Sequence, residues 1–141
     1  MATETETVVR LAILTSSDIV AARQRCRELS LSAGFAHCSV TLIVTALSEI
    51  ARNMLEHAED GEISLAVIDD GVKTGIEIVA TDRGPGIADV TAVLGDDALD
   101  GSWRPSGIGL PGARHLMDEF EIVSALGRGT TITMKKWKVD S

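Results

Sequence analysis

The stretch SEIARNMLEHA, residues 48–58, combines the pattern of a core helix with two polar side chains that such a helix does not need. Apolar residues recur within this stretch and just before it at three- and four-residue spacing, at Ile43, Leu47, Ile50 and Met54. This spacing predicts a core-facing helix over residues 39–58. Glu49 and Asn53 are four positions apart, so both side chains project from one face of that helix, beside the apolar stripe.

Length and composition point to one soluble globular domain over residues 1–141. The chain is 45% hydrophobic and 24% charged, and it lacks the uninterrupted apolar run of roughly 20 residues that spans a bilayer. Its first residues also lack the basic start and apolar centre of a signal peptide, so we expect a cytoplasmic protein without a membrane partner. Cys26 and Cys38 have no metal-ligand spacing, which favours buried thiols over a metal site.

The net charge argues against nucleic acid as a partner. Thirteen basic residues face 21 acidic ones, for a net charge of −8, and this excess opposes binding to phosphate backbones. Basic residues nevertheless gather in AARQRCRE, where Arg23 and Arg27 share one face of a helix. Either a solvated helix face or a surface for docking a partner explains this pair.

The remaining elements follow from local patterns. Residues 5–14 read as a first strand, and a helix follows with Ser16 or Ser17 and Asp18 as capping candidates and Gly34 as its stop. Asp-Gly at 70–71 lies between two runs in which apolar and polar residues alternate, and this pattern predicts a β-hairpin. The other expected elements are a helix beginning near LPGARHLMDEF (110–120) and two closing strands at 121–126 and 130–138. These elements predict an α+β fold, a two-layer sandwich whose mixed, mostly antiparallel sheet has helices on one face.

Two glycine-rich segments are candidates for binding a ligand. In DRGPGI, Asp82 stands at the end of a strand. An ionised carboxylate there can accept a hydrogen bond from an amino group such as that of adenine. The glycines that follow let the backbone approach the ligand closely. A plain turn is the alternative. SGIGLPGARHL (106–116) contains G-x-G-x-x-G without the preceding strand of a dinucleotide fold, and the chain has no P-loop motif. Its glycines open a helix whose N-terminus favours phosphate oxygens; the alternative is a simple helix entry under a loop.

The order of these segments resembles the GHKL family of ATPases and kinases. SEIARNMLEHA, DRGPGI, SGIGLPGARHLMDEF and GRGT match the family's N box, G1 box, G2 box and final glycine box, from about residue 5 to 137. The resemblance implies the Bergerat ATP-binding fold. It is closest to the stand-alone bacterial serine/threonine kinases that act as switches in the stressosome.

This resemblance implies roles for individual residues. Asn53 would be the ligand of Mg²⁺, and Glu49 would be the general base that acts on the incoming hydroxyl. Residues 90–106 would form a lid over the phosphates. The remaining ATP-binding positions would be Asp82, Gly84, Gly86, Ile87, Gly107, Ile108, Gly109, Leu110, Gly127, Gly129 and Thr130. Arg52, His57 and Trp103 receive no role; Arg52 either faces the nucleotide or pairs with Glu56.

The implied function is transfer of the ATP γ-phosphate to a separate protein. The expected substrates are STAS-domain scaffold and antagonist proteins, and a second expected partner is a PP2C-type phosphatase that is activated by binding. A homodimer is compatible with the resemblance. The alternative is an anti-sigma-type binding protein that uses ATP only to set its shape. Glu49 separates the two, because a pure binder has no need of a base beside its metal ligand.

Overall fold

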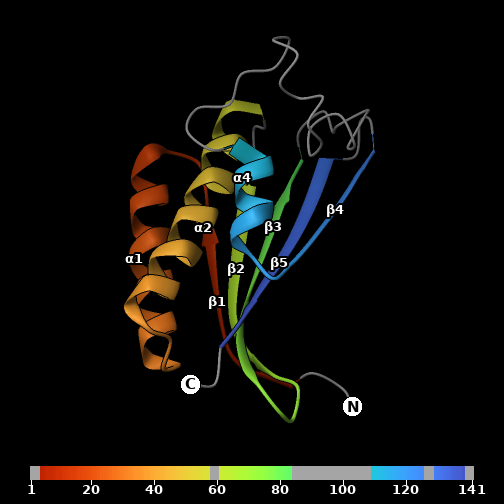
Figure 1. The fold of residues 1–141 in the computed structure, drawn as a ribbon. Coiled ribbons are helices and arrows are strands. Elements are labelled where there is room, and N and C mark those ends of the chain that lie inside the picture. The colour runs from red at the N-terminus through yellow and green to blue at the C-terminus, as the bar shows by residue number, and fades with distance from the viewer. Residues whose placement is uncertain (1–3, 58–60, 84–108, 126–128, 139–141) are drawn as a thin grey trace.

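The computed structural model describes residues 4–57, 61–83, 109–125 and 129–138, and Figure 1 shows its ribbon. Its elements, in chain order, are β1 (Glu4–Ala12), α1 (Ser16–Ser32), α2 (His37–His57), β2 (Gly61–Asp69), β3 (Thr74–Asp82), α4 (Gly109–Leu116), β4 (Glu119–Ala125) and β5 (Gly129–Trp137).

The five strands form one sheet in the order β1-β2-β3-β5-β4, and all four pairings between neighbouring strands are antiparallel. The three helices in the described residues lie on the same face of this sheet, with α2 between α1 and α4 (Figure 1). The predicted α+β class, with helices on one face of a largely antiparallel sheet, is therefore confirmed.

The core lies between the helices and the covered face of the sheet. Alternate residues of the central strands point into it, among them Ile63, Leu65, Ile76, Ile78, Ile132 and Met134. Residues between them point the other way because side chains alternate along a strand. Glu62 and Thr81, for example, are exposed on the uncovered face.

Helix α2 supplies the largest apolar stripe of the core. The four residues that predicted its buried face, Ile43, Leu47, Ile50 and Met54, are all fully or almost fully buried. The segment His37–Glu56 is long and apolar enough to cross a membrane by length and composition, but 56% of it is buried inside the protein. A core helix of a folded domain has these same properties, and the packing of α2 against the sheet accounts for its apolar composition.

Two local predictions are corrected by the structure. The N-cap of α1 is Thr15 rather than Ser16 or Ser17. In its capping box the Asp18 backbone N–H donates to the Thr15 side chain, and the Thr15 backbone N–H donates to the Asp18 side chain. The helix predicted over 110–120 ends at Leu116, and residues from Glu119 onward pair with β5 as strand β4.

The predicted hairpin is confirmed at its turn. Residues 70–73 connect β2 to β3, and Gly71 has a φ of 94°, a conformation that side chains with a Cβ rarely adopt. The Asp70 side chain accepts the backbone N–H groups of Val72 and Lys73 at 2.8 and 2.7 Å. These bonds close the turn and set the register that places Asp82 opposite Gly61.

Candidate functional site

The segments that carry the described site residues meet at one end of the molecule. The C-terminal half of α2, the end of β3 and the starts of α4 and β5 meet there, at the top of Figure 1. Antiparallel pairing brings the end of β3 beside the start of β5, so Asp82 is directly opposite Thr130. The topology therefore joins four segments that lie far apart in the sequence.

Glu49 is a buried carboxylate with a guanidinium beside it. The residue is only 8% exposed, although it sits on a helix that also carries exposed positions. Arg52 Nη1 donates to Glu49 Oε1 at 3.0 Å, and the Arg52 side chain is itself 42% exposed. The ion pair therefore extends from the buried carboxylate toward solvent. The guanidinium also holds one carboxylate oxygen in a fixed direction.

Asn53 lies one turn beyond Glu49 and is half-buried. The three positions 49, 52 and 53 fall on one side of α2 because residues three and four apart are neighbours on a helix. An acid, a cation and an amide thus share one short patch next to the core. The sequence identified the acid and the amide, and it left open whether Arg52 faces the nucleotide or pairs with Glu56. The ion pair with Glu49 connects Arg52 to the candidate site.

A second polar group forms where β3, β5 and β4 meet. Asp82 Oδ1 accepts the backbone N–H of Thr130 at 3.2 Å. The Thr130 side chain is buried, and its hydroxyl lies 2.8 Å from that of Ser124. Ser124 also donates to the carbonyl of Gly129 at 3.1 Å. Sequence reasoning missed Ser124, because a lone serine in a strand carries no motif and only the pairing of β4 with β5 brings it here.

Gly129 has a structural reason to be glycine. Its φ is +82°, and an added Cβ would lie 2.0 Å from the carbonyl oxygen of Asp82. The close approach of two backbones at the sheet's end therefore requires this glycine, whether or not a ligand binds. Gly109 opens α4, as the glycine cluster predicts.

The other predicted ATP-binding positions cannot be placed in this arrangement. Gly84, Gly86, Ile87, Gly107, Ile108 and Gly127 lie outside the described residues, as do Trp103 and the predicted lid over 90–106. The described backbone reaches Asp82 and Arg83 on one side of the gap and the start of α4 on the other.

The donor groups at this end fit a magnesium ion that is held mainly by a nucleotide. Within the described ranges, no group of three or more His, Cys, Asp or Glu side chains could hold a metal. Mg²⁺ commonly keeps several waters and takes only one or two protein ligands beside substrate phosphates. The Asn53 amide oxygen would suffice as the protein's contribution in that mode.

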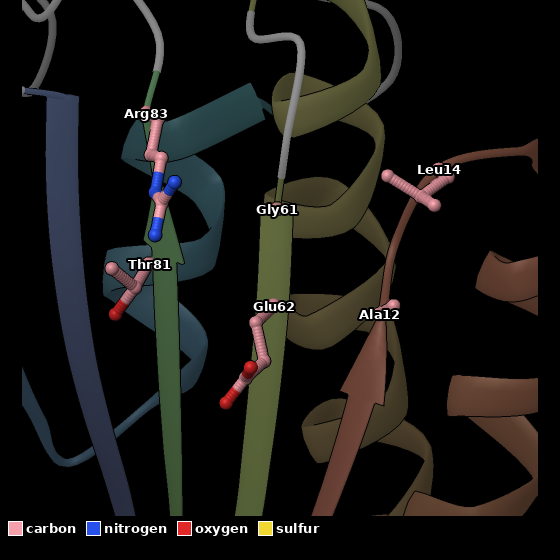
Figure 2. Close-up of a pocket in the computed structure, with 6 residues that line it drawn as sticks. All are labelled: Ala12, Leu14, Gly61, Glu62, Thr81 and Arg83. Atoms are coloured by element: carbon pink, nitrogen blue, oxygen red, sulfur yellow. The ribbon is translucent and has the colours of Figure 1, made fainter.

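A hollow of about 490 Å³ lies on the uncovered face of the sheet. Figure 2 shows the residues that line it, which are Ala12, Leu14, Gly61, Glu62, Thr81 and Arg83. Alternation along β3 places Thr81 and Arg83 on the face opposite Asp82. The hollow is thus separate from the polar groups around Glu49 and Asp82.

The cysteines play different parts. Burial raises the pKa of the Cys26 thiol to about 12, so this side chain stays a neutral member of the core. The prediction of a buried thiol is confirmed for Cys26 and wrong for Cys38, which is exposed near the start of α2.

Comparison with known proteins relates the chain to a family, to a kinase and to a solved structure. Residues 14–136 match the family model of the histidine kinase-like ATPase domain. The chain is 42% identical over 125 residues to the serine/threonine-protein kinase RsbT of Bacillus subtilis, an alignment that covers 89% of this chain and 92% of that protein. The crystal structure of the RsbU and RsbW domains of Rv1364c from Mycobacterium tuberculosis superposes with a TM-score of 0.65 at 22% identity, over 93% of this chain and 32% of that one. This last match concerns the fold alone.

Proposed function

The chain belongs to the histidine kinase-like ATPase family, and from that membership we propose that it transfers the γ-phosphate of ATP to a serine or threonine of a STAS-domain protein. The predicted GHKL family is confirmed. The 42% identity to a serine/threonine-protein kinase over most of both chains identifies an ATP-dependent kinase of the partner-switching type. The substrate, the site residues and the second partner are our proposals.

The observation that carries the proposal is the buried carboxylate of Glu49 on the same side of α2 as Asn53. A general base acts on the incoming hydroxyl and must be held in a fixed direction near the phosphate. The ion pair with Arg52 holds Glu49 in this way. The substrate hydroxyl would donate its proton to Glu49 while the hydroxyl oxygen forms a bond to the γ-phosphorus. At the same time the bond between the γ-phosphorus and the bridging oxygen of the β-phosphate would break.

The nucleotide would lie between α2 and the ends of β3 and β5. Asn53 would hold Mg²⁺ together with the phosphates, and the ion would supply charge neutralisation during phosphoryl transfer. The second oxygen of Asp82 would accept from the adenine amino group, since its Oδ1 already accepts from Thr130. The N-terminus of α4, opened by Gly109, would face the phosphates with its free N–H groups.

The competing function is an anti-sigma-type protein that binds ATP without useful catalysis. Such a protein needs the metal ligand and the adenine contacts, but it does not need a carboxylate beside them. Burying Glu49 also carries a desolvation cost, which the contact with the half-exposed Arg52 offsets only in part. A catalytic role explains why the cost is retained at this position, so the geometry favours the kinase.

A partner-switching kinase also needs a second partner after it leaves its substrate. We assign this role to a PP2C-type phosphatase that is activated by binding, within a stressosome-type pathway in the cytoplasm. The support is the similarity to RsbT together with the separation of surfaces described below.

The test is transfer of label from ATP to candidate STAS-domain proteins, followed by mapping of the modified residue. The proposal predicts stoichiometric label on one serine or threonine, dependent on Mg²⁺. Binding of ATP with hydrolysis to free phosphate, and with no label on any STAS protein, would refute it. Label on a histidine would assign the chain to the histidine kinases of the same family instead.

A further inference from the structure

Helix α1 presents an outward stripe with a composition unlike the rest of this acidic protein. Val20, Arg23, Arg27 and Leu31, which we call the docking stripe, fall within about 80° of the helix circumference because successive residues turn by about 100°. All four are exposed. The residues of α1 that face the core, Ala22, Cys26 and Ser30, are centred about 100° around the helix from the stripe, so the stripe occupies an exposed flank of α1.

The two arginines of the stripe have no acidic partner within the described residues. Neither makes an ion pair or a side-chain hydrogen bond within the part of the chain that the structure describes. Their neighbour Arg25 is different, because it lies 3.9 Å from Glu28 on the opposite flank of the helix. The stripe therefore bears two positive charges in a protein of net charge −8.

Apolar side chains flank the two charges. Val20 is 62% exposed and Leu31 is 39% exposed, although helix positions of this kind tolerate polar residues without cost to the core. They are about 16 Å apart along the helix axis, from the rise of 1.5 Å per residue. Arg23 and Arg27 lie between them, one turn apart. The order along the stripe is thus apolar, basic, basic, apolar.

We propose that the docking stripe binds an acidic amphipathic helix of the PP2C-type phosphatase, and in naming the phosphatase this inference rests on the proposed function. A helix with two carboxylates one turn apart between two apolar residues matches the stripe in charge and in length. Its apolar ends would cover Val20 and Leu31, and its carboxylates would meet Arg23 and Arg27.

Other occupants fit the stripe less well. Nucleic acid and anionic membranes are repelled by the net charge of −8, and two arginines neutralise few phosphates. A neutral apolar helix would leave both guanidinium groups facing an apolar surface at a desolvation cost. An acidic helix avoids both penalties.

The position of α1 makes docking compatible with catalysis. Helix α2 lies between α1 and α4 (Figure 1), and the stripe belongs to α1, whereas Glu49 and Asn53 belong to α2 and Asp82 ends β3. A partner on the stripe would not cover the predicted nucleotide site. Changes in the stripe should therefore alter partner binding without altering phosphotransfer.

The experiment is a binding titration of the phosphatase against the full chain and three variants, each at low and high salt. The double variant Arg23→Glu/Arg27→Glu should bind about tenfold more weakly or worse at low salt, with a smaller difference at high salt, because exposed charges are screened beyond roughly 10 Å at 0.1 M. Val20→Ser should weaken binding at both salt concentrations equally. Arg25→Glu, on the opposite flank, is the matched control and should bind like the wild type.

Circular dichroism and phosphotransfer from ATP to a STAS protein are measured on the same samples. Both should match the wild type in all variants, because the changed residues are exposed and far from the predicted site. Equal phosphatase affinity in the double variant and the wild type would overturn the docking stripe, and so would an equal loss in Arg25→Glu. A wild-type chain that binds phosphatidylserine vesicles through Arg23 and Arg27, or that binds no phosphatase, would also overturn it. Absence of phosphotransfer in the wild type counts instead against the proposed function.

Discussion

The pairing of Glu49 with Arg52 is the arrangement of single residues on which the proposed chemistry depends most. Helix pairs three residues apart usually contribute a few tenths of a kcal/mol to stability, because one or both side chains remain in water. Arg52 is 42% exposed, so its pair with Glu49 belongs to this weak class as a stabilising contact. Its value to the protein then lies in orienting the carboxylate.

Arg52 should accordingly matter more to the rate than to folding. We expect Arg52→Ala to lower kcat for phosphotransfer about tenfold or more while the melting temperature and the ATP affinity change little. Arg52→Lys keeps a positive charge near Glu49 and should recover part of the rate. A full rate in Arg52→Ala would remove the positioning role. A comparable loss of ATP affinity would place Arg52 on the nucleotide instead.

Asp82 offers a test of the predicted adenine contact that leaves the fold intact. Asp82→Asn can still accept the Thr130 N–H through its amide oxygen, whereas Asp82→Ala would lose that bond as well. The asparagine replaces the other carboxylate oxygen by a donor, so ATP binding should weaken by about 1 to 3 kcal/mol. Calorimetry measures this loss, and binding of a triphosphate without an adenine amino group should change less. An unchanged ATP affinity in Asp82→Asn would exclude the contact.

Among the elements, the start of α1 shows what the sequence could and could not reveal. Three consecutive hydroxyl residues, Thr15, Ser16 and Ser17, are all suitable N-caps, and only the backbone conformation selects Thr15. Asp18 accepts the backbone N–H groups of Leu14 and Thr15 at 2.8 and 3.0 Å. These two hydrogen bonds lower the pKa of Asp18 below 3.8.

The lowered pKa gives a stability change with a defined direction. Because the folded protein favours the ionised form of Asp18, its contribution is present above the unfolded pKa of 3.8 and disappears as the pH falls through the lower, folded value. Asp18→Asn should therefore melt below the wild type at neutral pH, and the difference should shrink below pH 3.8. The pKa of Asp70 is also lowered, but Asp70 is present in both the wild type and Asp18→Asn, so its contribution to stability cancels in the comparison. A difference that stays constant down to acid pH would contradict the assignment.

Strong local signals predicted several elements well. The apolar spacing in α2 and the Asp-Gly turn before β3 each reflect a short-range rule, either a helical repeat or a residue that tolerates positive φ. The end of α4 was misjudged because MDEF, residues 117–120, suits a helix or a strand equally, and pairing with β5 decides for the strand from Glu119 onward. Non-local pairing therefore decided where local preference did not.

At the scale of the whole molecule, the sheet order is the feature that no local pattern contained. Strand β5 inserts between β3 and β4, and this order alone brings Ser124 to Thr130 and Asp82. The candidate site could thus be predicted for α2 and β3, where motifs mark it, and not for β4. On the face of the sheet opposite the described helices, the hollow around Glu62 and Arg83 lies away from the predicted site.

The arrangement of the helices separates two jobs of a switch kinase. In the proposed function the end of the molecule near Glu49 and Asp82 would serve ATP and the substrate hydroxyl, while α1 lies on the side of α2 opposite α4 (Figure 1). Loss of the base should therefore leave a folded protein that still binds nucleotide and still docks its partner. In a binding protein without catalysis, replacing Glu49 would affect function no differently from replacing any other buried acid.

The most direct measurement is phosphotransfer to a STAS-domain protein by Glu49→Ala, with ATP affinity and phosphatase binding measured on the same preparation. If Glu49 is the general base, transfer should fall by about a hundredfold or more, because such groups contribute typically 10²–10⁴ to the rate. ATP affinity and phosphatase binding should stay close to the wild type. Phosphotransfer at the wild-type rate in Glu49→Ala would contradict the account.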